Sequence, residues 1–127
     1  MIFVDTNVFM YAVGGEHPLR VEAQAFFVEH VESTTPLVTS SEVLQELLHA
    51  YLPVGRLQTL DAALELAQSR AQQIWSLEEG DVVTARHLVT RHGGLGARDL
   101  LHLACCARRG VRRIRTFDRA LAAAAEE

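Results

Sequence analysis

Short apolar segments alternate with longer stretches of helical periodicity along this chain, and this alternation narrows the choice of fold. Four runs have the length and composition of buried strands, namely residues 2–4, 37–39, 74–77 and 111–117. Apolar residues recur at helical spacing over about 18–31, 41–51, 57–73, 81–89 and 99–107, and an alanine-rich helix follows residue 118. Strands joined by helical crossovers pair in parallel. The pattern therefore predicts an α/β fold with a short parallel sheet of about four strands flanked by helices.

The length and the hydropathy of the chain indicate one domain and no membrane segment. Its 127 residues, 49% of them apolar, suit one compact domain over residues 1–127. No apolar run approaches the roughly 20 residues of a membrane span, and the N-terminus lacks the pattern of a signal peptide. We therefore expect a cytoplasmic protein without a membrane segment. Cys105 and Cys106 are neighbours inside an apolar helical pattern, and we expect both in the core.

The charge is distributed unevenly along the chain. Residues 1–85 hold three arginines against twelve acids, net −9, whereas residues 86–127 hold nine arginines against four acids, net +5. These two values give the overall charge of −4, and the chain has no lysine. Every fixed cation is thus a guanidinium, which suits bidentate contacts to phosphate.

Four carboxylates stand where a parallel sheet would gather functional groups. Asp5 and Asp118 directly follow predicted strands, and Asp99 follows a glycine-rich loop at the start of a helix. Glu46 lies two turns into a helix, among leucines that favour partial burial. Functional groups of such sheets collect beyond the carboxyl ends of the strands. Several buried carboxylates need protons or a cation to offset their repulsion, and oxygen ligands with neither His nor Cys in reach favour Mg²⁺ or Mn²⁺.

Each of these acids also has an ordinary structural interpretation. Asp99 and Asp118 fit helix N-caps, and Glu46 fits a solvated helix residue. Glu42, one turn before Glu46, competes with it as the acid of that helix. Asp5, in a polar triplet after a buried strand, favours a functional role more strongly.

Four segments in order resemble PIN domains, especially VapC-type toxin ribonucleases. They cover nearly the whole chain: Val4-Asp5-Thr6-Asn7-Val8-Phe9, then Ser40-x-x-Val43-Leu44-Gln45-Glu46-Leu47, then Ala97-Arg98-Asp99-Leu100-Leu101-His102-Leu103-Ala104, then Thr116-Phe117-Asp118. The resemblance implies a Rossmann-like fold and an endoribonuclease that depends on Mg²⁺ or Mn²⁺. It also implies a homodimer and a small antitoxin partner.

Carried over residue by residue, the family's acids fall on Asp5, Glu46, Asp99 and Asp118. The Ser-x-x-Val-Leu-x-Glu pattern selects Glu46 over Glu42. As the resemblance implies, Asp5 and Asp99 are direct metal ligands, Glu46 is a ligand or the base that orients water, and Asp118 is an outer or second-metal ligand. Thr6, Asn7 and Thr116 are supporting polar groups. The loop over residues 93–96 is more glycine-rich than the family pattern leads us to expect.

The basic residues and histidines receive separate interpretations. Arginines around the last strand are candidates to hold RNA phosphates, the alternative being a solvated, ion-paired surface: Arg112, Arg113, Arg115 and Arg119. None of the six histidines shows paired metal-ligand spacing. His102, inside an apolar helix, is predicted to be a core residue with its hydrogen bonds satisfied.

Three other functions are alternatives to a toxin ribonuclease. A phosphatase or receiver domain that uses a phospho-aspartate needs a lysine near the aspartate, and the chain has none. A housekeeping PIN nuclease without an antitoxin would share every motif. A catalytically inert metal-binding module would have lost one of the four acids, and none is lost.

Overall fold

The computed structural model describes residues 1–126 and builds an alternating α/β fold. In the described residues the strands are β1 (Ile2–Val4), β2 (Leu37–Ser40), β3 (Gln73–Trp75) and β4 (Arg113–Arg115). The helices are α1 (Thr6–Val13), α2 (Arg20–Glu29), α3 (Ser41–Tyr51), α4 (Leu57–Arg70), α5 (Glu79–Leu88), α6 (Ala97–Arg108) and α7 (Arg119–Ala125). The predicted α/β class and the small strand number are thus confirmed.

All strand pairs are parallel, in the order β3-β2-β1-β4. The central strands β1 and β2 are buried along their whole length, whereas both edge strands are partly exposed. Because the strands are parallel, their carboxyl ends lie at one edge of the sheet. The residues that follow β1, β2 and β4 therefore gather there.

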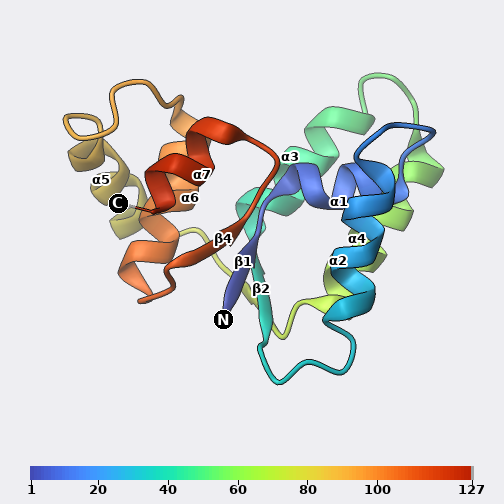
Figure 1. Ribbon diagram of the computed structural model, residues 1–127. Coiled ribbons are helices and arrows are strands. Elements are labelled where there is room, and N and C mark those ends of the chain that lie inside the picture. Colours follow the sequence, from blue (N-terminus) through green and yellow to red (C-terminus); the bar gives the residue numbers. More distant parts are fainter. Residues whose placement is uncertain (127) are drawn as a thin grey trace.

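Helices cover both faces of this sheet. Figure 1 shows α1 to α4 on one side and α5 to α7 on the other. The larger core cluster includes Phe3, Phe9 and Leu47, each at most 1% exposed, and two smaller clusters lie under α5, α6 and α7. Cys105 and Cys106 are buried and free, as predicted. Among residues 1–126, no helix has the length and apolar character to cross a membrane.

Element boundaries differ from the sequence expectations at several ends. Strand β3 covers residues 73–75 instead of 74–77, and β4 is shorter than the predicted 111–117. Helix α6 begins at Ala97, two residues before its predicted start, because Gly96 in extended conformation leads directly into good helix formers. Asp99 therefore lies in the first turn and is not an N-cap.

The packing of α2 and α5 shows which of their residues face the core. In α2, Val21 and Val28 are 75% and 71% exposed, whereas Phe26 and Phe27 are buried. The aromatic rings bury more apolar surface than valines, and they set the orientation of the helix. The helix predicted over residues 81–89 begins earlier, because α5 starts at Glu79, and Asp81 in its first turn is fully buried.

Candidate active site

The four predicted acids line one cavity at the carboxyl edge of the sheet. Its volume is about 520 Å³, and its lining includes Asp5, Glu46, Asp99 and Asp118 together with Thr6, Asn7, Met10, Gly96, Ala97 and Arg98. Asp5 follows β1 and caps α1, while Asp118 follows β4 and caps α7. Glu46 comes from α3 and Asp99 from α6. Four separate parts of the chain thus bring carboxylates to one place.

Asp5 is 5% exposed and is held at both oxygens. Its Oδ1 accepts a hydrogen bond from the Thr6 backbone N–H at 2.7 Å, and its Oδ2 accepts one from the Thr116 hydroxyl at 2.7 Å. Burial raises the pKa of Asp5, although the charge of His102 and these two hydrogen bonds act in the opposite direction. The carboxylate is therefore fixed in place with part of its desolvation cost uncompensated.

Glu46 is 9% exposed and its Oε2 accepts two hydrogen bonds. The donors are the Thr6 hydroxyl at 2.6 Å and His102 Nε2 at 2.8 Å. Burial raises the pKa of Glu46, but the bond and charge of His102 and the Thr6 bond outweigh it, so that the net pKa is lowered. Glu46 is the acid of this cavity that neighbouring donors keep ionised.

Asp99 has its pKa raised to about 6, first by burial and then by the charges of Asp118 and Asp5. Its own helix begins at Ala97, so Asp99 sits in the first turn, where the helix dipole favours a negative charge. Asp118 is partly engaged as a cap, because its Oδ1 accepts from the Leu121 backbone N–H at 3.1 Å. Both the cap role and the cavity position predicted for Asp118 are therefore present at once.

The three polar residues predicted to support the acids are joined in a network. Besides its bond to Asp5, the Thr116 hydroxyl accepts from the Asn7 side-chain amide at 3.2 Å and from the Asp118 backbone N–H at 3.0 Å. The Asn7 side-chain oxygen accepts from the Phe117 backbone N–H at 3.1 Å. These bonds tie the segment after β4 to the start of α1, and so hold Asp5 and Asp118 near each other.

His102 belongs to this site, which the sequence reasoning missed. It is fully buried, as predicted, but Nδ1 has no hydrogen-bond partner among the described residues, so the expectation of a satisfied core histidine is wrong. The premise that no histidine lies in reach of the acids is also wrong, because Nε2 lies 2.8 Å from Glu46 and 3.4 Å from Asp5. The sequence feature that could have predicted this is the position of His102 one helical turn after Asp99, on the same face of α6.

The arginines predicted to hold RNA do not line this cavity. Arg112 and Arg113 lie at the amino end of β4, away from the edge that carries the acids. Arg115 pairs with Glu22 at 2.9 Å, and Arg119 is exposed in the first turn of α7. The arginine of the cavity lining is Arg98, which the sequence reasoning did not single out.

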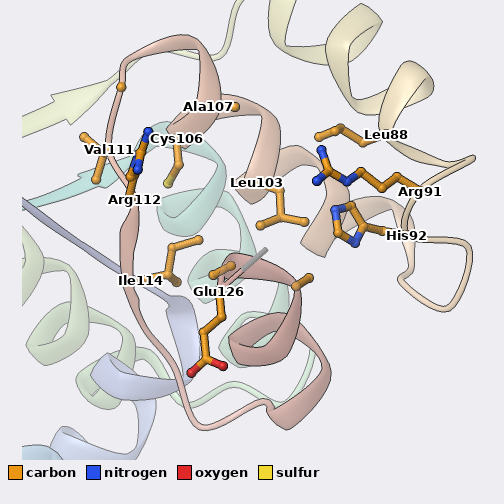
Figure 2. Close-up of a pocket in the computed structure, with 13 residues that line it drawn as sticks. Leu88, Arg91, His92, Leu103, Cys106, Ala107, Val111, Arg112, Ile114 and Glu126 are labelled. Atoms are coloured by element: carbon orange, nitrogen blue, oxygen red, sulfur yellow. The ribbon is translucent and has the colours of Figure 1, made fainter.

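A second cavity of about 480 Å³ opens beside β4, between α5, α6 and α7. Figure 2 shows Arg112 on its lining together with apolar side chains such as Leu88, Leu103 and Ile114. None of the four acids is among its lining residues. The acidic cavity is therefore the one with chemistry that matches the sequence motifs.

Glu42, the competitor of Glu46, does not line the acidic cavity. It is half-buried, and its pKa is raised by burial and by the charge of Glu46. It thus lies close enough to influence Glu46 electrostatically, but it receives none of the hydrogen bonds that orient Glu46. This geometry favours Glu46 as the functional acid of α3.

The donor set of the cavity fits a hard divalent cation. Asp5, Glu46 and His102 offer ligand atoms that all lie within 4.8 Å of one another. Burial and mutual repulsion raise the pKa of Asp99 and Asp5, which is the electrostatic situation that a bound cation relieves. The carboxylate oxygens of this set are the donors that Mg²⁺ and Mn²⁺ prefer, whereas the His102 nitrogen is not.

Comparisons with known proteins bear on the family and the fold of the chain. The family model described as PIN domain matches residues 2–127. The chain is 62% identical to Ribonuclease VapC23 of Mycobacterium tuberculosis over 98% of both chains. Its fold is similar to the crystal structure of M. tuberculosis VapC20, a Sarcin-Ricin loop cleaving toxin, with a TM-score of 0.82, 19% identity and coverage of 98% and 95%. A structure of Rickettsia felis VapBC2 bound to a promoter DNA fragment matches with a TM-score of 0.67 and 19% identity, over 93% and 88%.

Proposed function

Because the chain belongs to the PIN domain family, we propose that it is a metal-dependent endoribonuclease and the toxin of a type II toxin–antitoxin pair. The observation that carries the nuclease assignment is the convergence of Asp5, Glu46, Asp99 and Asp118 on one cavity. The 62% identity to a protein named Ribonuclease VapC23 supports RNA as the substrate and favours a toxin over a housekeeping nuclease.

The proposed reaction is hydrolysis of an RNA phosphodiester bond. A bound Mg²⁺ or Mn²⁺ supplies activation of water at neutral pH and neutralisation of charge on the phosphate. Asp5 and Asp99 would hold the metal directly, and Asp118 would be an outer or second-metal ligand. Glu46 would act as a ligand or as the base that orients the attacking water. Thr6 and Thr116 would hold Glu46 and Asp5 in position through the hydrogen bonds described above.

For the RNA itself, Arg98 is a better candidate than the arginines of the last strand. It is exposed and lines the acidic cavity, where its guanidinium lowers the pKa of Glu46 after the contributions of His102 and Thr6. A cation at the rim of an otherwise acidic cavity suits contact with a phosphate next to the scissile bond. Arg119, beside Asp118, remains a candidate for a more distant phosphate.

The proposed partners follow from the relatives. The Rickettsia felis structure holds VapBC2 on a DNA fragment from its promoter, and a cognate antitoxin is proposed for this chain. Such a toxin acts on RNA in the cytoplasm, and a homodimer is the proposed assembly. Growth arrest on expression, relieved by co-expression of the protein encoded by the adjacent reading frame, would support the toxin assignment. Normal growth despite active enzyme would favour a housekeeping nuclease instead.

The nuclease assignment is tested with purified protein and labelled single-stranded or structured RNA. We expect cleavage with Mg²⁺ or Mn²⁺, loss of cleavage in EDTA, and loss in Asp5→Asn. The matched control is Asp61→Asn, which makes the same chemical change on the exposed surface of α4. Cleavage that persists in EDTA, or in Asp5→Asn at the wild-type rate, would show that the acidic cavity is not the active site.

A further inference from the structure

His102 lies close to two of the acids, Asp5 and Glu46. Its Nε2 is 2.8 Å from Glu46 Oε2 and 3.4 Å from Asp5 Oδ1, and the side chain is fully buried. These distances allow two different roles. A bare Nε2 would be a third ligand for a cation, whereas an Nε2 that carries a proton would hold the carboxylates as a hydrogen-bond donor.

The other ring nitrogen decides between these roles. Nδ1 is buried and has no hydrogen-bond partner within residues 1–126, and the ring packs against Phe3 with centroids 5.4 Å apart. In the neutral ring, placing the single proton on Nδ1 would leave a buried donor without an acceptor, which is strongly unfavourable. A proton on Nε2 has the Glu46 carboxylate at hydrogen-bond distance. Nε2 therefore carries a proton in the neutral ring as well as in the charged ring, and a protonated nitrogen cannot coordinate a metal.

A proton on Nε2 of His102 fixes the orientation of the Glu46 carboxylate. Its Oε2 accepts from both Thr6 and His102, so the carboxylate is held at one oxygen by two donors from α1 and α6. Oε1 is then the oxygen available to a cation. On the basis of the proposed function, we propose that His102 is a positioning residue that donates from Nε2 to Glu46 and directs Glu46 Oε1 toward the metal, without being a ligand itself.

This role also predicts the choice of metal. If His102 is a donor, the ligands around the cation are all oxygens, which favours Mg²⁺ and Mn²⁺ over Zn²⁺. If His102 were a ligand, its nitrogen would increase the affinity for Zn²⁺. The hydrogen-bonding state of one buried ring thus determines the metal preference of the site.

The first experiment examines the wild-type protein and needs no variant. Nitrogen NMR of histidine-labelled protein, without metal and with Mg²⁺, should show a protonated Nε2 on His102 in both states. Pulsed EPR with Mn²⁺ should show no nitrogen hyperfine coupling from a coordinated imidazole. A bare Nε2 with a protonated Nδ1, or a coordinated nitrogen on Mn²⁺, would overturn the proposal.

The second experiment uses three variants and calorimetric titration with Mn²⁺. The side-chain amide of Gln reaches the position of Nε2, that of Asn reaches the position of Nδ1, and Leu has no donor. His102→Leu and His102→Asn should bind Mn²⁺ about 10–100-fold more weakly, the usual loss for a residue that orients a metal ligand, whereas His102→Gln should regain most of the affinity. The proposal is contradicted if His102→Leu binds Mn²⁺ as tightly as the wild type. It is also contradicted if the Leu and Gln variants, shown to be folded by circular dichroism, lose the same affinity for Mn²⁺.

These measurements separate the inference from the proposed function. If the wild type fails to cleave RNA but Nε2 is protonated and Gln restores Mn²⁺ binding, the positioning role stands while the nuclease assignment fails. If the wild type cleaves RNA but His102 coordinates Mn²⁺, the nuclease stands and the positioning role fails.

Discussion

Asp99 is a single residue whose charge opposes folding of the metal-free protein. Its pKa is raised to about 6 by burial and by Asp118 and Asp5, whereas the ordinary value is 3.8. A raised pKa means that the folded state binds the proton more tightly than the unfolded state. The contribution of Asp99 therefore makes the metal-free protein more stable as pH falls from about 6 toward about 4.

Asp99→Asn should abolish cleavage and stabilise the metal-free protein at neutral pH. The amide removes a charge that repels its neighbours, and after allowance for solvent screening the gain should be about 1 kcal/mol. Urea denaturation in EDTA measures it, and Asp61→Asn on exposed α4 is the matched control. If Asp99→Asn is less stable than the wild type, the main effect of Asp99 is to stabilise the first turn of α6.

At the level of secondary-structure elements, Asp81 joins α5 to α6. Its fully buried carboxylate accepts from Arg108 and Arg109 at 2.7 Å each and from the Glu78 backbone N–H at 2.8 Å. Burial raises the pKa of Asp81, but the hydrogen bonds from Arg109 and Arg108 outweigh this and hold it well below its usual range. Apolar periodicity predicts only that a helix begins near residue 81, whereas the contacts of Asp81 with the two arginines arise from the packing of α5 against α6.

Asp81→Asn should destabilise the protein by about 3 kcal/mol at neutral pH, because it removes one partner of a buried ion pair. A lowered pKa gives stability that is present above the unfolded value of 3.8 and is lost as pH falls through the folded value. The difference between wild type and variant should therefore shrink as the pH is lowered below about 4. Glu79→Gln, at an exposed position in the same first turn of α5, is the control. A difference that does not change with pH would rule out the ion pair as its source.

For the whole molecule, metal binding should be linked to folding stability. The proposed Mg²⁺ site exists in the folded protein and not in the unfolded chain, so each tenfold rise in free Mg²⁺ above its dissociation constant should add about 1.4 kcal/mol. Thermal melts across a Mg²⁺ series measure this, with Asp5→Asn as the variant that should lose the response. A wild-type melting temperature that is insensitive to Mg²⁺ and Mn²⁺ would contradict a metal site.

The assembly of the molecule is a separate prediction. Val21 and Val28 on α2 are 75% and 71% exposed, and Leu57 at the start of α4 is 52% exposed. Apolar surface of this kind favours association, and we expect a homodimer at tens of micromolar by light scattering. Val28→Asp should shift the protein toward the monomer while its helical content stays unchanged. A wild-type monomer at that concentration would refute the homodimer.

Local features of the sequence were sufficient for the fold class and for the position of three of the acids. Apolar periodicity predicted parallel strands joined by helices, and Asp5, Asp99 and Asp118 were placed at element ends, because these features depend on neighbours within a few residues. The family pattern added Glu46, which helical position alone did not distinguish from Glu42.

Contacts between distant residues were decided only by the tertiary structure. The bond between His102 and Glu46 joins residues 56 positions apart, and helix packing rather than local propensity brings them together. The same holds for Asp81 with its two arginines, and for Arg98 at the cavity in place of the arginines of β4. Hydrogen bonds and ion pairs of this kind depend on side-chain direction and burial. Both are set when the elements pack against one another, and neither is encoded in the spacing of residues along the chain.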